Sequence, residues 1–568
     1  MRLVPWVKAR EKLIAPLLLV AAAVAWGVAV VWHVLAAGLP LWSMEAARSI
    51  YEFGFGGKTG EPPEAGLLAL AGYLGKGGAA LAALYAYFKV LDLSADRLWL
   101  RFIYRNHVVI VGLGEKASRL ALSLREAGHR VAVIELNENH GAVPALRAAG
   151  VAVLPGDGRS ADVLHQAGLQ RADALVCLTD SDAANLRVAL AARQASERRR
   201  RRAPLRCYVH VADRSLRQIA SEAPHYRQQD RHFDGRVLDV VDVAARVLLT
   251  EWAPDRVAPL HEAGAERLHV LVVGADALAR AIVVNLALQA HYAQPQRPVV
   301  TLLDPLASQA LVQLTAEYPA LSTLLEVRAQ DVSLPHLSPS RLTERTGQAT
   351  DGAASLPTLD LAFVTLERDI DALAAGLHLS RLTRGWPRRP QVVVCMPPHS
   401  EVMGAVGVDN TAEALGFATF DRYSVCSGAY LLGDAIDRDA RQRHEAYLAK
   451  IEAAGRPLRN KPTQCPWDEL DEMVKASNRR QVEHEPVKRR ALEQLGNSAQ
   501  TVELLARAEH RRWMADLLMA GWSYSPQYDW ARRRHNNLVA YEELDEATRE
   551  FDRAVIIQML PDAGPPAA

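Results

Sequence analysis

The sequence predicts an α/β protein with an N-terminal two-helix transmembrane segment, two tandem Rossmann-like parallel-sheet units and a small, mainly α-helical C-terminal domain. Three observations predict this order: two apolar runs of membrane-spanning length, two stretches in which strand-like and helical patterns alternate, and a charged, helical C-terminal stretch. The chain has 568 residues, and domains average about 150 residues, so three or four units are expected. The predicted boundaries are 1–100, 101–260, 261–430 and 431–568.

Composition excludes some classes of function. Apolar residues make up 49% of the chain and charged residues 23%, as in ordinary globular proteins. The net charge of +1 gives no support for nucleic-acid binding, and we expect no nucleic-acid partner. The cysteines lack C-x-x-C spacing, so we expect reduced thiols in a reducing compartment and no metal site; they are Cys177, Cys207, Cys395, Cys426 and Cys465.

The N-terminal part contains two candidate membrane spans. Residues 13–37 form an apolar run without a charged side chain, long enough to cross a bilayer and too long for a signal peptide. Residues 67–91 form a weaker run that contains Lys76 and Lys89 and is rich in Gly and Ala, which favours close helix packing. A helix lying on a surface is the alternative for the second run.

Charges beside these runs predict the topology. Arg and Lys residues precede the first run and follow the second, so both termini are expected in the cytoplasm of a multi-pass protein of the bacterial inner membrane; they are Arg2, Lys8, Arg10, Lys12, Arg97, Arg101 and Arg105. Between the runs, Gly54-Phe55-Gly56 resembles the core of a potassium filter, but Glu52-Phe53 stand where Thr-Val is expected. A plain glycine-rich turn is therefore the favoured interpretation.

The first Rossmann-like unit begins with a dinucleotide-binding fingerprint. A strand at 107–111 ends in Gly112-Leu113-Gly114, a helix pattern begins near Ala117, and a second strand ends at Glu135. In this context Gly112 permits the tight turn, Gly114 admits a phosphate to the helix N-terminus, and Ala117 allows close packing of helix and strand. Glu135 would accept hydrogen bonds from ribose hydroxyls and repel a 2′-phosphate, which disfavours NADP.

Two further motifs identify the type of unit. Strands at 151–154 and 174–178 lead into Gly156-Asp157-Gly158 and into the T-D-x-D-x-x-N segment that begins at Thr179-Asp180; a fifth strand lies at 206–211. On these motifs, residues 107–220 resemble the TrkA-N domain, also called the RCK domain, of bacterial potassium channels and transporters. The resemblance implies binding of NAD(H), ATP, ADP or cyclic dinucleotides and assembly as dimers or larger rings. It also implies that Asp157, Thr179 and Asp180 line the cleft beside Gly112, Gly114 and Glu135, although a Rossmann fold with an empty site is the alternative.

The same pattern recurs in residues 261–430, which indicates an internal duplication. Strand patterns lie at 269–273, 299–303, 325–328, 361–366 and 392–396. The second fingerprint is degraded, because Asp276 stands in place of the glycine that would admit a phosphate. We therefore expect this unit to be structural or dimerising rather than a second nucleotide site.

The C-terminal part carries three short motifs in one helical, aromatic stretch. They are Glu509-His510-x-x-Trp513, Gly521-Trp522-x-Tyr524 and Ala540-Tyr541-x-x-Leu544. Residues 465–560 thereby resemble the ryanodine receptor (RyR) repeat domain, with Ala540 where proline is usual. The resemblance implies an adenine-type small molecule, for which Trp513 and Trp522 would offer stacking faces and Arg479, Arg512 or His535 would meet phosphates. The alternative is that these aromatic side chains form the core of a small domain.

These features favour a non-catalytic function. Neither a nucleophile–base pair nor a metal cluster stands out, and nothing orients Glu509-His510 as an acid–base pair. We expect a membrane-anchored nucleotide sensor in which NAD(H) or an ATP, ADP or AMP-type nucleotide controls ion flux of the potassium type or membrane disruption in antiviral defence. Because two helices cannot enclose a water-filled path, a homo-oligomer in the lipid bilayer is expected, a dimer or a tetramer. The alternatives are a membrane-tethered NAD-dependent oxidoreductase and a scaffold that only dimerises.

Overall fold

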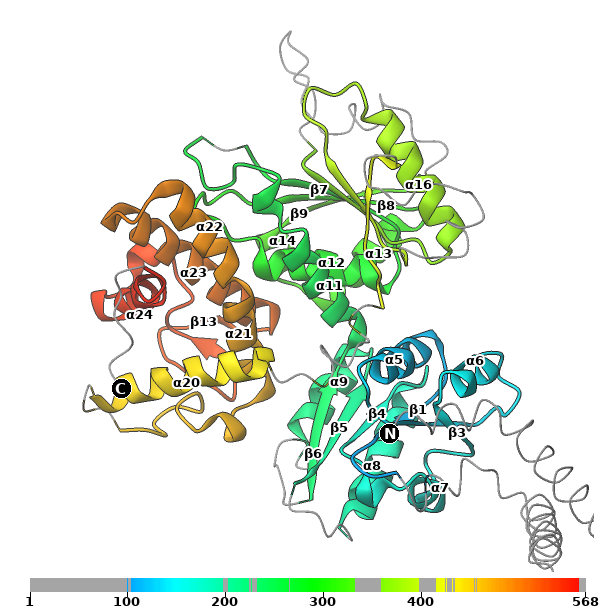
Figure 1. The fold of residues 1–568 in the computed structure, drawn as a ribbon. Coiled ribbons are helices and arrows are strands. Elements are labelled where there is room, and N and C mark those ends of the chain that lie inside the picture. Colours follow the sequence, from blue (N-terminus) through cyan, green and yellow to red (C-terminus); the bar gives the residue numbers. More distant parts are fainter. Residues whose placement is uncertain are drawn as a thin grey trace, which may run out of the picture. The chain divides into compact units, whose positions relative to one another are not determined.

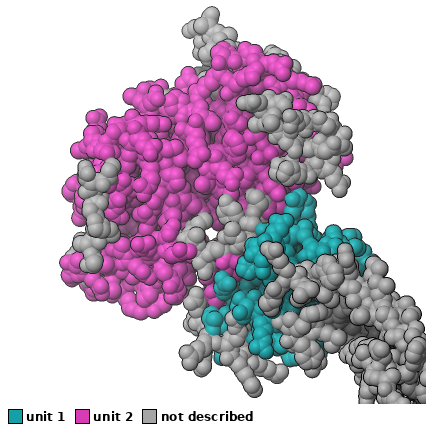
Figure 2. Space-filling view, in the orientation of Figure 1, with its two compact units in different colours: residues 1–207, 231–233 teal, residues 208–230, 234–568 magenta. Residues whose placement is uncertain are grey.

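The structure, a computed structural model, divides into two compact units. It describes residues 100, 104–197, 203–223, 226, 232–264, 266–332, 359–397, 415–423, 425, 432, 435–453, 455 and 457–560. Unit 1 comprises residues 1–207 and 231–233, and unit 2 comprises residues 208–230 and 234–568 (Figure 2). Both predicted membrane spans and Cys426 lie outside the described residues. Of the helices within the described ranges, none combines the length and apolar character needed to cross a membrane.

The first sheet is six-stranded and has the strand order β3-β2-β1-β4-β5-β6 (Figure 1). Its strands are β1 (Val108–Val111), β2 (Val131–Glu135), β3 (Ala152–Pro155), β4 (Ala174–Cys177), β5 (Leu205–His210) and β6 (Phe233–Leu238). Strand β1 pairs in parallel with both β2 and β4, so the chain changes direction across the sheet between β1 and β4. The side chains of β1 and β4 are buried on both faces, as parallel sheets covered by helices require.

Helices connect these strands, and several begin at a capping side chain. They are α5 (Glu115–Glu126), α6 (Val143–Ala148), α7 (Ala161–Gln166), α8 (Asp182–Ser196), α9 (Arg214–Glu222) and α11 (Val240–Glu251). Ser181 caps α8, Asp213 caps α9 and Asp239 caps α11, each by accepting a backbone N–H of the first turn. Helix α5 has Gly114 at its N-cap and receives no side-chain cap.

The second sheet repeats this arrangement within unit 2. Its order is β12-β11-β10-β7-β8-β9, the same topology as in the first sheet, and its neighbouring strands pair in parallel. The elements are β7 (His269–Val273), α12 (Ala277–Gln289), β8 (Val299–Leu303), α13 (Ala307–Glu317), α14 (Leu321–Leu324), β9 (Glu326–Gln330), β10 (Leu361–Val364), α16 (Asp369–Leu382), β11 (Gln391–Val394) and β12 (Ala418–Thr419). The repeated topology agrees with the predicted duplication.

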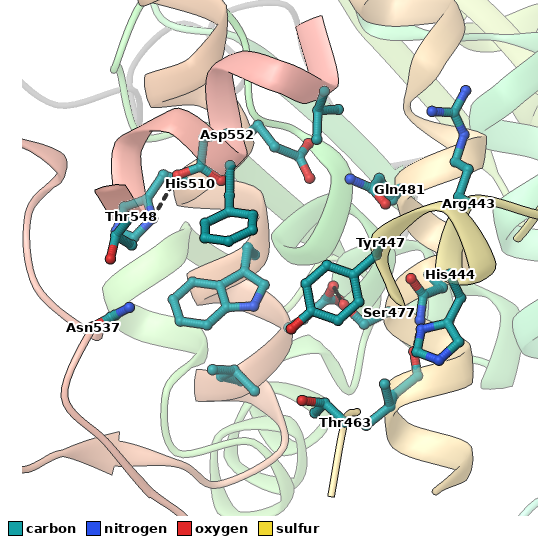
Figure 3. Close-up of a pocket in the computed structure, with 18 of the residues that line it drawn as sticks. Arg443, His444, Tyr447, Thr463, Ser477, Gln481, His510, Asn537, Thr548 and Asp552 are labelled. Carbon is teal, nitrogen blue, oxygen red and sulfur yellow. Dashed lines mark hydrogen bonds and ion pairs between the residues drawn. The ribbon is translucent and has the colours of Figure 1, made fainter. Parts of the chain in front are cut away.

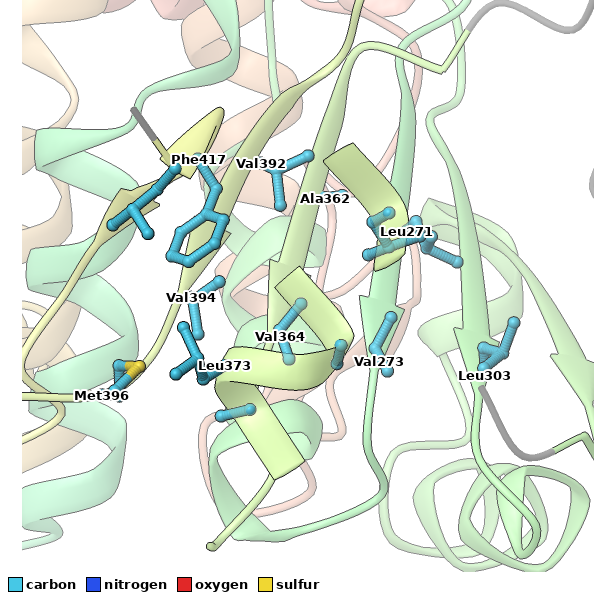
Figure 4. Packing of buried hydrophobic residues seen from close by; sticks show 14 of the residues in the cluster. Leu271, Val273, Leu303, Ala362, Val364, Leu373, Val392, Val394, Met396 and Phe417 are labelled. Atoms are coloured by element: carbon cyan, nitrogen blue, oxygen red, sulfur yellow. The ribbon is translucent and has the colours of Figure 1, made fainter. Parts of the chain in front are cut away.

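One face of the second sheet is buried against α16 (Figure 4). Val273, Val364 and Val394 from three neighbouring strands pack there with Leu373 and Phe417. Gly376 of α16 faces this cluster, because a Cβ at that position would lie 2.5 Å from the Val394 side chain. Close packing of helix on sheet therefore depends on a residue without a side chain.

The C-terminal part of unit 2 is mainly helical, as predicted. It contains α20 (Ala435–Ala453), α21 (Glu472–Glu483), α22 (Glu485–Leu495), α23 (Ala499–Met519) and α24 (Glu546–Ile557), with short strands β13 (Ser523–Tyr524) and β14 (Arg534–His535). Helix α23 packs against α24 and also against α12 of the second Rossmann-like unit, and α20 packs against α21. Ala540 has φ −59°, a value that a proline at this position would also adopt.

Candidate functional sites

The first candidate site lies where the first sheet changes direction, at the carboxyl ends of β1 and β4. Ligands of open α/β sheets bind at this position. Gly112 directly follows β1 with φ +97°, and a Cβ there would lie 3.0 Å from the Leu178 carbonyl oxygen and 3.1 Å from Thr179 Cα. Both the backbone conformation and the close approach of β4 therefore require glycine at this turn.

Gly114 stands at the open end of α5. Its φ of −65° suits any residue, and the nearest atom to a Cβ there would be Asp180 Oδ1, 3.7 Å away. Ala117 beneath it is fully buried. Because no side chain caps α5, the N–H groups of its first turn point toward this space and would attract an anion.

Glu135 and Asp157 lie at the carboxyl ends of the next two strands. Glu135 ends β2, and its Oε1 accepts the backbone N–H of Asn137 at 2.8 Å. Asp157 follows β3 and pairs with Arg159 at 2.7 Å, and this hydrogen-bonded pairing lowers the pKa of Asp157. The structure thereby places the guanidinium of Arg159 at this end of the sheet. Sequence reasoning missed this residue, although Arg159 directly follows the Gly156-Asp157-Gly158 motif.

The turn after β4 is held by its own side chains. Thr179 Oγ1 donates to Asn185 Oδ1 at 2.8 Å, and Asn185 Nδ2 donates to the Thr179 carbonyl at 3.0 Å. Asn185 is fully buried, so Thr179 is committed to shaping the loop. Of the neighbours Thr179 and Asp180, it is Asp180 whose side chain faces Gly114.

At the corresponding position of the second Rossmann-like unit, the protein's own side chains fill the space. Asp276 caps α12 by accepting the N–H of Ala279 at 2.8 Å, and its other oxygen pairs with Arg422 at 3.3 Å. The Arg422 guanidinium also donates to carbonyl oxygens that follow β10 and β11, those of Thr365 and Cys395. A cation and a carboxylate thus occupy the edge that a phosphate would need, in line with the structural role predicted for this unit.

The second candidate site is a cavity of about 440 Å³ in the C-terminal helices (Figure 3). It is lined by residues of α20, α21, α23 and α24 and by the segments around 461–464 and 522–537. Tyr447, Trp513 and Phe551 supply aromatic surface, and Gln481, Asn537 and Thr548 supply hydrogen-bonding groups. The lining also contains charged side chains, such as Arg443 and Lys461, so the cavity combines aromatic surface with many polar groups. Tyr447 and the rest of α20 were not predicted as site residues, because they precede every motif.

His535 changes the expected stacking geometry. Its ring centroid lies 5.0 Å from that of Trp513 and 6.1 Å from that of Trp522. Trp522 is itself buried, and its Nε1 donates to Met473 Sδ at 3.3 Å. The imidazole of His535 lies beside both rings, so a base could stack between Trp513 and Trp522 only if His535 moved; stacking at these residues stays a prediction. Trp513 is the more exposed indole and lines the cavity directly.

His510 is oriented by partners that the sequence did not reveal. Its Nε2 donates to the Val539 carbonyl at 3.0 Å, and its Nδ1 lies 3.3 Å from Asp552 Oδ2 (Figure 3). Burial raises the pKa of Asp552. With both ring nitrogens engaged, His510 is a structural donor at the cavity wall rather than a general base.

Glu509 belongs to a buried ionic network. Its carboxylate pairs with Lys488 and with Arg512, and Arg512 also pairs with Asp516 at 2.6 Å. Burial opposes ionisation of Glu509, yet Arg512 and Lys488 hold its pKa well below the usual range. This network joins α22 to α23, so the glutamate of the motif fixes helices and does not act with His510.

Three other predicted residues are not among those lining this cavity. Arg479 pairs with Asp437 and Glu472 and borders a different cavity; Tyr524 is 56% exposed on β13; Tyr541 is buried beneath Arg507 and Arg549. The guanidinium carbon of Arg479 instead lies 6.0 Å from the centroid of the Trp467 ring. Burial together with Lys461 and His510 lowers the pKa of His535 to about 4, so this ring stays neutral at neutral pH.

Comparison with known proteins identifies two domains. Residues 108–222 match the family model of the TrkA-N domain and residues 485–561 match that of the RyR domain, the two families that the motifs resemble. The Trk system potassium uptake protein TrkA homolog of Pyrococcus abyssi is 27% identical over 142 residues, which is 25% of this chain and 58% of that protein. The chain thus spans little more than half the length of this relative.

Among solved structures, the chain is similar to the GsuK channel. The structure of GsuK bound to ADP is 17% identical, with a TM-score of 0.36, over 75% of this chain and 98% of that one. The GsuK channel bound to NAD is 15% identical, with a TM-score of 0.37, over 77% of this chain and 86% of that one.

Proposed function

We propose that this protein is a membrane-anchored, non-catalytic nucleotide sensor that controls potassium-type ion flux. The TrkA-N domain is the receptor in this proposal, and the ligand is NAD(H) or an adenine nucleotide of the ATP, ADP or AMP type. The match to a Trk potassium uptake protein supports the transport role. Residues 13–37 and 67–91 would anchor a dimer or tetramer in the bilayer, with both termini cytoplasmic.

The observation that carries the proposal is the uncapped N-terminus of α5 beside Gly114. Gly112, Glu135, Asp157 and Asp180 surround it at the carboxyl edge of the sheet. A pyrophosphate there would meet backbone N–H groups and the guanidinium of Arg159, while Glu135 would bind the ribose. The carboxylate of Asp180 favours a ligand whose hydroxyl or amino group donates to it.

The C-terminal cavity supports a second ligand site. Trp513 and Tyr447 would supply the stacking surface, and Gln481 and Asn537 would bind the edge of a base. Stacking on one aromatic face contributes about 1–3 kcal/mol, by analogy with single-stranded nucleic acids. We propose a purine-containing ligand that differs from the ligand of the TrkA-N domain.

Mass spectrometry of nucleotides that co-purify with the detergent-solubilised protein tests the proposal. We expect a stoichiometric nucleotide and nucleotide-dependent rubidium flux in liposomes, without turnover of NADH. Steady NADH oxidation would favour a tethered oxidoreductase. Purified protein that neither retains nor binds any nucleotide would favour a scaffold that only dimerises.

A further inference from the structure

Helix α21 separates two cavities and presents a different face to each. Val474, Ser477, Asn478 and Gln481 are spaced as one face of a helix and line the C-terminal ligand cavity. Glu472, Ala476 and Arg479 lie on another face and line a second cavity of about 320 Å³. The helix is therefore a shared wall, and a shift of its first face must also move its second.

The second face of α21 is joined by ion pairs to α20 and to residues 236–246. Arg479 pairs with Asp437 of α20, and Asp437 also pairs at 3.2 Å with Arg236 of β6. Glu483 at the end of α21 pairs at 2.6 Å with Arg246 of α11. All five side chains are less than a third exposed, so solvent screens these pairs only partly.

These contacts reach the segment that follows the TrkA-N domain along the chain. Strand β6 is the edge strand of the first sheet, and α11 packs on α12 of the second Rossmann-like unit. Two ion-pair links thus connect α21 to two consecutive elements, β6 and α11. One is Arg479–Asp437–Arg236 to β6, and the other is Glu483–Arg246 to α11.

We propose that α21 transmits occupancy of the C-terminal cavity to β6 and α11 through these two ion-pair links. The proposal rests on the second ligand site proposed above. A ligand that contacts Asn478 and Gln481 shifts α21, and the paired arginines carry the shift to residues 234–251. By linkage, if occupancy of the cavity changes the affinity of a ligand that binds at β6 or α11, that ligand changes the affinity of the cavity for its own ligand by the same factor.

Hydrogen–deuterium exchange on the full-length protein tests this coupling, and it can do so without a ligand because variants of Gln481 can fill the cavity. Gln481→Trp inserts an indole into the cavity and should change exchange in residues 234–238 and 240–251 by at least about fivefold, the low end of usual couplings. Gln481→Met, which keeps the volume, is the fold control. If the indole unfolds the C-terminal helices, Gln481→Phe is the smaller insertion that replaces it.

Removing one of the two ion-pair links should separate the exchange response of residues 234–238 from that of residues 240–251. In the Arg236→Gln background, Gln481→Trp should no longer change exchange in 234–238 but should still change it in 240–251, because Glu483–Arg246 remains. Arg441→Gln, which removes an α20 pair with Asp468, is the matched control and should leave both responses intact. Altered exchange in α20 and α21 with unchanged exchange throughout 234–251 would overturn the proposal.

A parallel measurement adds AMP to the wild-type protein. Protection in α21 and α24 together with a change in 234–251 supports both proposals. Absence of any AMP protection counts against an AMP-type ligand in the cavity, while the Gln481 variants still decide whether α21 is coupled to β6 and α11.

Discussion

Two glycines separated by one residue have different tasks in the TrkA-N domain. Gly112→Ala should destabilise the fold by about 1–3 kcal/mol, because it combines a left-handed backbone with contacts at 3.0–3.1 Å. Gly114→Ala should change stability by less than about 0.5 kcal/mol, because its nearest contact would be 3.7 Å. Thermal unfolding of both variants checks this, and equal losses would contradict the assignment.

Because of His107, the free energy of unfolding of unit 1 should decrease at acidic pH. Burial lowers the pKa of this histidine from 6.5 to about 4, while its Nε2 donates to the Ala167 carbonyl. Between these values the unfolded chain binds a proton that the folded chain refuses, so stability is full above about pH 6.5 and falls toward pH 4. The slope is at most about 1.4 kcal/mol per pH unit.

His107→Gln retains a donor for Ala167 and should remove this part of the pH dependence. Scanning calorimetry at pH 7 and pH 5 compares the two proteins. The difference in unfolding temperature between these pH values should be smaller in the variant. An identical difference would show that His107 does not titrate as described.

Side-chain roles in the candidate sites could be predicted only where backbone geometry decides them. Gly112, Gly114 and Ala117 follow from the strand–turn–helix pattern, because local sterics fix what fits there. The roles of Glu509 and Arg479 depend on partners such as Lys488 and Asp437, which lie 21 to 42 residues away along the chain. Motif spacing contains no information on such pairs.

At position 376, where helix α16 comes closest to the second sheet, a side chain should not be tolerated. Gly376→Ala would gain about 1 kcal/mol of helix propensity, but its Cβ would lie 2.5 Å from Val394 and 3.1 Å from Phe417. Overpacking costs about 1–3 kcal/mol, so a net loss is expected. Gly385→Ala, where nothing lies within 4 Å, is the matched control for chemical denaturation. A stabilised Gly376→Ala protein would contradict the packing described.

The second Rossmann-like unit should depend on Arg422 for stability rather than for binding. Arg422→Met removes the partner of the partly buried Asp276 and the donors to the carbonyls after β10 and β11. Breaking such a pair costs about 3–5 kcal/mol. A lower unfolding temperature without a gain in nucleotide binding is expected. Stoichiometric binding of an additional nucleotide by the variant would reveal a latent site.

Elements with strong apolar patterns were predictable, and weak edge strands were not. The predicted strands β1 to β5 and β7 to β11 lie within one or two residues of the observed bounds. Strand β6 was missed because Asp234, Gly235 and Arg236 interrupt its pattern, and β12 was missed because it has two residues. Both are edge strands, which gain order from pairing with a neighbour rather than from their own sequence.

At the level of the complete chain, two ligand sites and a membrane anchor would form one sensor. A second ligand at the aromatic cavity would bias residues 234–251 through α21. Nucleotide at α5 would be coupled to that cavity only if it altered the same residues, because coupling requires that both sites alter a common element. The membrane helices would convert the shift into altered ion flux only in an oligomer, since two helices per chain cannot enclose a path.

Calorimetric titration of the full-length protein with NAD, NADH, ATP, ADP and AMP tests the central claim most directly. We predict that at least one nucleotide binds the wild type and Gly141→Asp, which places the same charge on an exposed loop where nothing lies within 4 Å. In Gly114→Asp, a carboxylate takes the position of the phosphate at α5, and affinity should fall at least about a hundredfold. Unchanged affinity for every nucleotide in folded Gly114→Asp would contradict the claim that the TrkA-N domain is the sensor.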